Sequence, residues 1–97
     1  MAVIETTTFR LAEGVADAAF LEADEQVRTG FLYQQPGLAR ATTARGDDGE
    51  WIVVVLWVSD EDANAAERRA PSDPATGALM ALVDARTVDR RRYNTFD

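Results

Sequence analysis

Residues 51–58, WIVVVLWV, form an unbroken apolar run of eight residues, and this run constrains the fold more than any other stretch. Most of its side chains are β-branched or aromatic, which favours a β-strand over a buried helix. Alternation divides the side chains into two faces, with Trp51, Val53, Val55 and Trp57 on one and Ile52, Val54, Leu56 and Val58 on the other. Because both faces are apolar, we expect a central strand that is covered on both sides.

A helix start follows the run directly. Ser59 precedes Asp62 by three residues, a spacing that resembles a capping box with Asp in place of Glu or Gln. We therefore expect Ser59 to cap a helix from Asp60 to about Arg69. Asp60, Glu61 and Asp62 would occupy its first turn, where the helix dipole favours carboxylates. We interpret this acidic triplet as capping, and a metal site is the alternative.

The composition excludes several kinds of site. The chain has 97 residues, which fit one domain, and a net charge of −7, which argues against a nucleic-acid partner. It contains neither cysteine nor histidine, so we expect no disulfide, no metal site and no cofactor such as haem. We find no signal-peptide pattern and no apolar run of membrane-spanning length. We therefore expect a cytoplasmic protein without a membrane partner.

The first part of the chain predicts a strand and a long helix. Residues 2–11 alternate in a pattern rich in threonine and valine, which suits a strand. Asp17 is the expected N-cap of the helix that follows. An apolar stripe then recurs at helical spacing through Ala16, Ala19, Phe20, Ala23, Val27 and Phe31. Four residues lie off this stripe and are expected to be exposed to water, namely Glu22, Asp24, Glu25 and Arg28.

Turn signals and prolines divide the rest of the chain. Residues 38–46 predict a second, more polar strand, and GDDG at 46–49 predicts a hairpin turn rather than a calcium loop. Pro74 suits the first position of a further helix capped by Asp73. Residues 87–96 predict a last strand, which carries three consecutive arginines at 90–92. We interpret these arginines as charges that keep an edge strand from pairing with other strands, and an anion site is the alternative.

This order of elements is the split βαβ, or ferredoxin-like, pattern of an α+β fold. It predicts one domain spanning residues 1–97, with a four-stranded antiparallel sheet and helices on one face. Right-handed crossovers place the first and third strands in the centre and the other two at the edges. We expect the tryptophan-bearing face of the third strand to lie opposite the helices. Since that face is too apolar to remain in water, a homodimer is predicted to cover it.

These segments resemble a known superfamily. The chain is similar to the dimeric α/β-barrel proteins related to antibiotic biosynthesis monooxygenases, in VIETTTFRL at 3–11, EGVADAAF at 13–20, QQPGL at 34–38 and DGEWIVVVLWVSDEDANAA at 48–66. The resemblance implies a homodimer whose two sheets form a barrel, with a pocket between sheet and helices in each subunit. It also implies that some relatives oxidise polyketide-type aromatic molecules with oxygen and no metal or flavin, whereas others degrade haem.

Some family residues carry over to this chain and others do not. Trp57 matches the tryptophan of the third strand. The oxygenases commonly use an asparagine as well, but threonines stand at positions 6–8 of the first strand. The haem-degrading branch uses a histidine, which this chain lacks, so haem degradation is not expected.

We predict a ligand site beside Trp57, bordered by aromatic side chains and oriented by a few polar ones. The candidate residues are Trp57, Tyr33, Arg40, Tyr93, Phe20 and Phe31. Trp57 could instead be a core residue, because large aromatics dominate protein cores. The expected ligand is a planar aromatic or weakly acidic small molecule. Two functions remain open, a cofactor-independent monooxygenase-like enzyme and a non-catalytic dimeric binding or stress-related protein.

Overall fold

The computed structural model describes residues 2–96. Within this range the strands are β1 (Val3–Phe9), β2 (Leu38–Arg45), β3 (Trp51–Trp57) and β4 (Asp89–Asn94). The α-helices are α1 (Asp17–Gly30), α2 (Asp60–Arg69) and α3 (Pro74–Met80). Short 3-10 turns follow α1, α2 and α3 as η1 (Leu32–Gln34), η2 (Ala70–Ser72) and η3 (Ala85–Thr87). Every predicted strand and helix is present, and the first and last strands are shorter than predicted.

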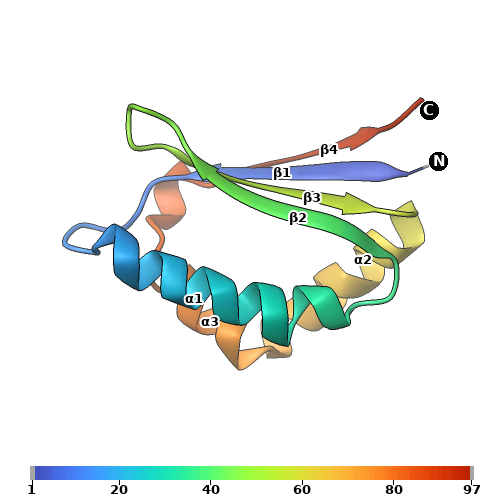
Figure 1. Ribbon diagram of the computed structural model, residues 1–97, viewed down its shortest axis with the longest axis horizontal. Helices are drawn as coiled ribbons and strands as arrows, with labels where there is room; N and C mark the ends of the chain where they lie inside the picture. The colour runs from blue at the N-terminus through green and yellow to red at the C-terminus, as the bar shows by residue number, and fades with distance from the viewer. Residues whose placement is uncertain (1, 97) are drawn as a thin grey trace.

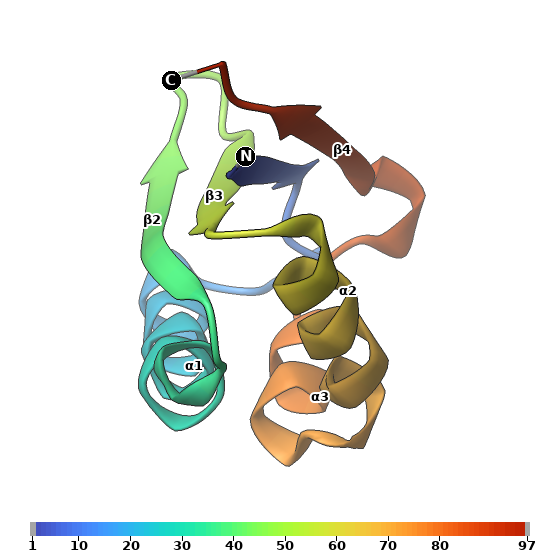
Figure 2. The same cartoon turned by 90° about the vertical axis from the view of Figure 1, so that its right-hand side faces the viewer.

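The strands form one antiparallel sheet in the order β2-β3-β1-β4. The two predicted central strands are therefore central, and the two predicted edge strands are edges. All three α-helices lie on the same side of the sheet (Figures 1 and 2), with α1 beneath β2 and with α2 and α3 on the other side of the space below the sheet. The predicted ferredoxin-like α+β fold is confirmed.

The prediction of which sheet face the helices cover was wrong. Trp51, Val55 and Trp57 are all buried on the helix side, with Trp57 only 2% exposed. The opposite face carries the other set of apolar side chains, and Val58 just beyond β3 is 56% exposed. Because both faces of β3 are apolar, hydrophobicity alone did not distinguish them. The larger tryptophan surface is buried within the chain, and the aliphatic face remains uncovered.

Helix α1 differs from the prediction at two acidic residues. Its N-cap is Ala16, and Asp17 is instead the first helical residue, where it pairs with Arg45 of β2. Asp24 was expected to be exposed, but it is only 2% exposed and lies 3.4 Å from Arg28 Nε. The buried stripe follows the large side chains at 20, 27 and 31, and Asp24 stands on that line. Ala16 and Ala19, which belonged to the predicted stripe, are exposed.

The predicted caps of the second and third helices are confirmed. The backbone N–H of Asp62 donates to Ser59 Oγ at 3.1 Å, and the Ser59 hydroxyl donates to Asp62 Oδ2 at 3.0 Å. The N–H of Thr76 donates to Asp73 Oδ2 at 2.9 Å, with Pro74 in the first turn. Ser59 and Asp62 thus form the cap of α2, whereas Asp60 of the same acidic triplet pairs with Arg92.

Two apolar clusters fill the space between the sheet and the helices. The first contains Val3, Ala41, Val55, Trp57, Ala63 and Ala66. The second contains Phe9, Phe20, Trp51 and Val83, with the Phe20 ring 4.7 Å from the Trp51 ring. Val53 packs against both clusters. The first cluster, beside α2, forms part of the wall of the cavity described next.

Candidate ligand-binding site

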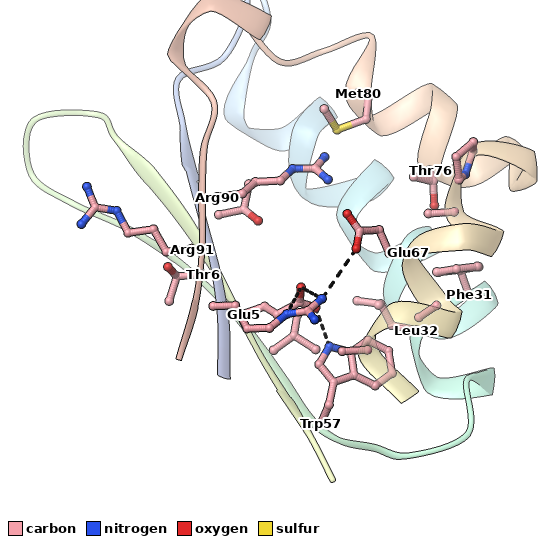
Figure 3. A pocket seen from close by; sticks show the side chains of 17 residues that line it. Glu5, Thr6, Phe31, Leu32, Trp57, Glu67, Thr76, Met80, Arg90 and Arg91 are labelled. Atoms are coloured by element: carbon pink, nitrogen blue, oxygen red, sulfur yellow. Dashed lines mark hydrogen bonds and ion pairs between the residues drawn. The ribbon is translucent and has the colours of Figure 1, made fainter. Parts of the chain in front are cut away.

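An open cavity of about 680 Å³ lies between the helix-facing side of the sheet and helices α2 and α3 (Figure 3). Its apolar lining comes from Phe31, Leu32, Val55, Trp57, Ala63, Ala66 and Met80. Its polar and charged lining comes from Glu5, Thr6, Thr7, Glu67, Thr76, Arg90, Arg91 and Arg92. A mostly apolar wall with a few polar groups is typical of small-molecule sites.

One end of the cavity is built around Trp57. Its indole Nε1 donates a hydrogen bond to Glu5 Oε1 at 2.7 Å. Glu5 stands on β1 two residues after Val3, the direct partner of Trp57 on β3, and therefore on the same side of the sheet as Trp57. The second oxygen of Glu5, Oε2, accepts from Arg92 Nη2 at 2.9 Å and from Nε at 3.3 Å. Three adjacent strands therefore hold the indole ring in one orientation.

Arg92 joins this end of the sheet to α2. Its Nη1 donates to Asp60 Oδ1 at 3.1 Å and to Asn64 Oδ1 at 2.6 Å, and its Nη2 lies 3.6 Å from Glu67 Oε2. Hydrogen bonding to Glu5 is the main cause that raises the pKa of the Arg92 guanidinium above its ordinary value. The positive charge of Arg92 is thus matched by several carboxylates before any ligand arrives.

The three arginines of β4 have different surroundings. Arg90 and Arg92 pair in register with Thr7 and Glu5 and share the helix-facing side, so Arg91 between them faces the other way. Figure 3 shows the Arg90 side chain extending into the cavity toward Met80, whereas the Arg91 side chain points away, although Arg91 also borders the cavity. Arg91 Nε lies 3.1 Å from Asp89 Oδ2 on that far side. No ion pair engages the Arg90 side chain within residues 2–96.

Two of the predicted site residues line the cavity. Trp57 does so despite its burial, and so does Phe31, which follows the last residue of α1 and has a non-helical backbone (φ −124°, ψ −63°). Phe20 does not reach it and packs instead in the second cluster with Trp51. Tyr33 lies in η1 and is 52% exposed.

The other two predicted site residues lie on the uncovered face of the sheet. Tyr93 is in register with Ile4 and is 48% exposed. Arg40 borders a shallow hollow there with Ile4, Thr42, Val54 and Leu56. A register irregularity between Leu38 and Arg40 decides on which face of the sheet Arg40 lies. Leu38 pairs with Trp57, but Arg40, two residues later, pairs with Leu56, the immediate neighbour of Trp57 on β3. The structure therefore does not bring Arg40 or Tyr93 to Trp57.

Sequence reasoning missed Glu5, Arg90 and Arg92 as lining residues. The alternation of β1 could have identified Glu5, because it shares a face with Val3 and Phe9, the two buried ends of the strand. Finding the two arginines also required the register of β4 against β1, which the sequence does not supply.

The functional groups that line the cavity are carboxylates, guanidinium groups, hydroxyls, one indole and the thioether of Met80. No group of three or more metal-ligating side chains occurs among residues 2–96. No helix in the described part of the chain is long and apolar enough to cross a membrane. The lining suits binding of an apolar, planar molecule with a polar edge.

The fold is shared with several solved structures. SnoaB from Streptomyces nogalater, described as a cofactor-independent oxygenase, is similar over 99% of this chain and 94% of its own, with 21% identity and a TM-score of 0.81. A protein from Bordetella bronchiseptica assigned provisionally as an antibiotic biosynthesis monooxygenase matches over 98% of this chain and 97% of its own. Its identity is 14% and its TM-score 0.80. One from Caulobacter crescentus with the same provisional assignment has 13% identity, a TM-score of 0.81, and coverage of 99% and 91%.

Comparisons of the sequence with family models and with curated proteins find no match. The structural similarity spans nearly the whole chain at low identity, so it establishes the architecture. The predicted resemblance to proteins of the antibiotic biosynthesis monooxygenase type is confirmed at the level of the fold.

Proposed function

We propose that this protein binds a planar aromatic or polyketide-like molecule in the cavity beside Trp57 and oxygenates it without a metal or flavin. The observation that carries the proposal is the cavity itself, which combines an apolar wall with an indole fixed by Glu5 and Arg92. The similarity in fold to SnoaB, described as a cofactor-independent oxygenase, supports this choice of reaction.

In such a reaction the substrate supplies the electrons. A methylene group between aromatic rings and one O₂ give a carbonyl group and one water molecule. The protein then has three tasks, which are to hold the ring system, to exclude bulk water and to stabilise the deprotonated substrate. Phe31, Leu32 and Val55 provide an apolar wall for the first two tasks, and Arg90, which extends into the cavity, supplies positive charge for the third.

A non-catalytic binding protein is the second candidate, and one observation favours it. Catalysis needs a group that accepts a proton from the substrate. Glu5 already accepts from both Trp57 and Arg92, and Glu67 lies 3.6 Å from Arg92. Both carboxylates of the lining thus already face Trp57 or Arg92, rather than being turned toward a bound molecule.

Binding and oxygen consumption distinguish the two candidates. Trp57 emission, measured in a Trp51→Phe background, should change saturably as anthrone-type and anthraquinone-type compounds are added. An oxygen electrode and mass spectrometry then show whether the bound anthrone is converted to its quinone. Saturable binding with conversion supports the enzyme, and saturable binding alone supports the second candidate. No binding of any compound contradicts both.

We further propose that a second copy of the chain covers the uncovered sheet face. Ile4, Val54 and Leu56 line an apolar hollow there, and a domain of this size buries only about two-thirds of its unfolded surface on its own. Light scattering at micromolar concentration should give twice the chain mass of 10.6 kDa. Val54→Lys should produce monomers, because it buries a charge in the interface. A wild-type protein of single-chain mass contradicts this assembly.

A further inference from the structure

Met80 is the sulfur-bearing side chain of the cavity. The sequence contains no cysteine and two methionines, Met1 and Met80, so Met80 carries the one sulfur atom within residues 2–96. It is the last residue of α3 and lines the cavity between that helix and the sheet. Figure 3 shows its thioether pointing toward the guanidinium of Arg90. The proposed reaction gives this sulfur no role.

Met80 is also the oxidisable side chain that solvent reaches. It is 36% exposed, whereas the two indoles, Trp51 and Trp57, are 5% and 2% exposed. Peroxides oxidise thioethers, and this is a common oxidative reaction of methionine in proteins. Because the chain has no cysteine thiolate to compete, a peroxide that enters the cavity reacts first at Met80.

The reaction of Met80 with hydrogen peroxide is a two-electron oxidation of the sulfur. A sulfur lone pair attacks one peroxide oxygen, so that the S–O bond forms and the O–O bond breaks. The proton on the transferred oxygen passes to the departing hydroxide, and the products are methionine sulfoxide and one water molecule. The change is reversible, because reductases specific for each sulfoxide epimer restore the thioether.

A sulfoxide at this position changes the apolar wall of the cavity. It converts a flexible apolar side chain into a polar one that carries a hydrogen-bond acceptor. The Arg90 guanidinium has donors for that oxygen, since no ion pair engages it within residues 2–96. A hydrogen bond to Arg90 keeps the oxygen inside the cavity, where an apolar ring then meets a polar group.

We infer that Met80 is a site of reversible oxidation by peroxides, and that its oxidation lowers the affinity of the cavity for an apolar ring system. This inference rests on the proposed ligand cavity and adds a means of regulating it. It applies to both candidate functions, because each of them requires the ligand to bind.

The test treats the purified protein with hydrogen peroxide, removes the peroxide by desalting and measures binding of anthraquinone-2-carboxamide by equilibrium dialysis. Tryptic peptide 70–86, which contains Met80, should gain one oxygen atom, and peptide 46–68 with both tryptophans should not. The affinity for the probe should fall roughly tenfold, the effect of placing a polar group against an apolar ligand. Treatment with both classes of methionine sulfoxide reductase should restore the affinity.

Met80→Leu is the matched control, because leucine has a similar volume and no sulfur. Its affinity for the probe should be the same before and after peroxide treatment. Met80→Gln, which is polar like the sulfoxide, should bind the probe more weakly than Met80→Leu without any peroxide. An unmodified Met80, full affinity in the oxidised protein, or an equal fall in Met80→Leu overturns this inference while the cavity proposal stands. No binding of the probe to untreated wild type overturns both.

Discussion

The indole of Trp57 and the carboxylate of Glu5 are joined by a 2.7 Å hydrogen bond, and the same carboxylate is paired with Arg92 through its other oxygen. A buried N–H left without an acceptor is costly, and so is a half-buried guanidinium without its carboxylate. We predict that Glu5→Ala lowers the free energy of unfolding by about 1–2 kcal/mol, a value reduced for the partial exposure of the pair. Urea denaturation measures this loss.

Glu5→Gln separates the two interactions of that side chain. Its amide oxygen can still accept from Trp57, but the charge that faces Arg92 is gone. We expect a smaller loss of stability than for the alanine variant, and a Trp57 indole proton resonance that stays close to its wild-type position. The spectrum is recorded in a Trp51→Phe background. An unchanged indole resonance in Glu5→Ala contradicts the hydrogen bond.

The cap of α2 gives a second prediction. Ser59→Ala removes the acceptor of the Asp62 N–H, and the loss should be about 1 kcal/mol. Because Ser59 lies beyond the end of β3 and outside the uncovered sheet face, the mass by light scattering should not change. A denaturation midpoint equal to that of wild type shows that the cap contributes nothing.

Two glycines make a matched pair for a third prediction. Gly37 has a φ of +82°, and a Cβ built there lies 2.6 Å from the Cβ of Asp62. Gly37→Ala should therefore cost about 1–3 kcal/mol from backbone strain and overlap. Gly77 stands within α3 with nothing near its missing Cβ, so Gly77→Ala should add roughly 0.5–1 kcal/mol. Thermal unfolding of both variants should show shifts of opposite sign.

The dependence of the folding stability on low pH gives a fourth prediction. Hydrogen bonds from the side chain and backbone N–H of Arg86 lower the pKa of the Asp84 carboxyl below its ordinary value of 3.8. A carboxyl with a lowered folded-state pKa stabilises the fold above its unfolded pKa, and this contribution is lost as the pH falls through the folded value. Asp84→Asn keeps an acceptor for the backbone N–H and should show a shallower loss of stability below pH 3.8. Urea midpoints measured across this range test it, and identical slopes exclude a contribution from Asp84.

Local signals in the sequence predicted the parts of the fold that depend on neighbouring residues. Ser59 and Asp73 cap their helices, and GDDG turns the hairpin, because these features need only three or four residues. The site depends on pairings between distant strands. Arg40 and Tyr93 were placed near Trp57 by their order along the chain, whereas the irregularity after Leu38 and the register of β4 set them on the other face. Arg90 and Arg92 occupy the cavity for the same reason.

Val53 is the one residue within 2–96 that packs against both apolar clusters. Substitutions in well-separated parts of a core have nearly additive effects on stability, whereas neighbouring ones interact. The cluster around Phe20 and Trp51 can therefore preserve the architecture while side chains around Trp57 change. Evolution can therefore change which molecule the cavity beside Trp57 accepts, while the cluster around Phe20 and Trp51 keeps the chain folded.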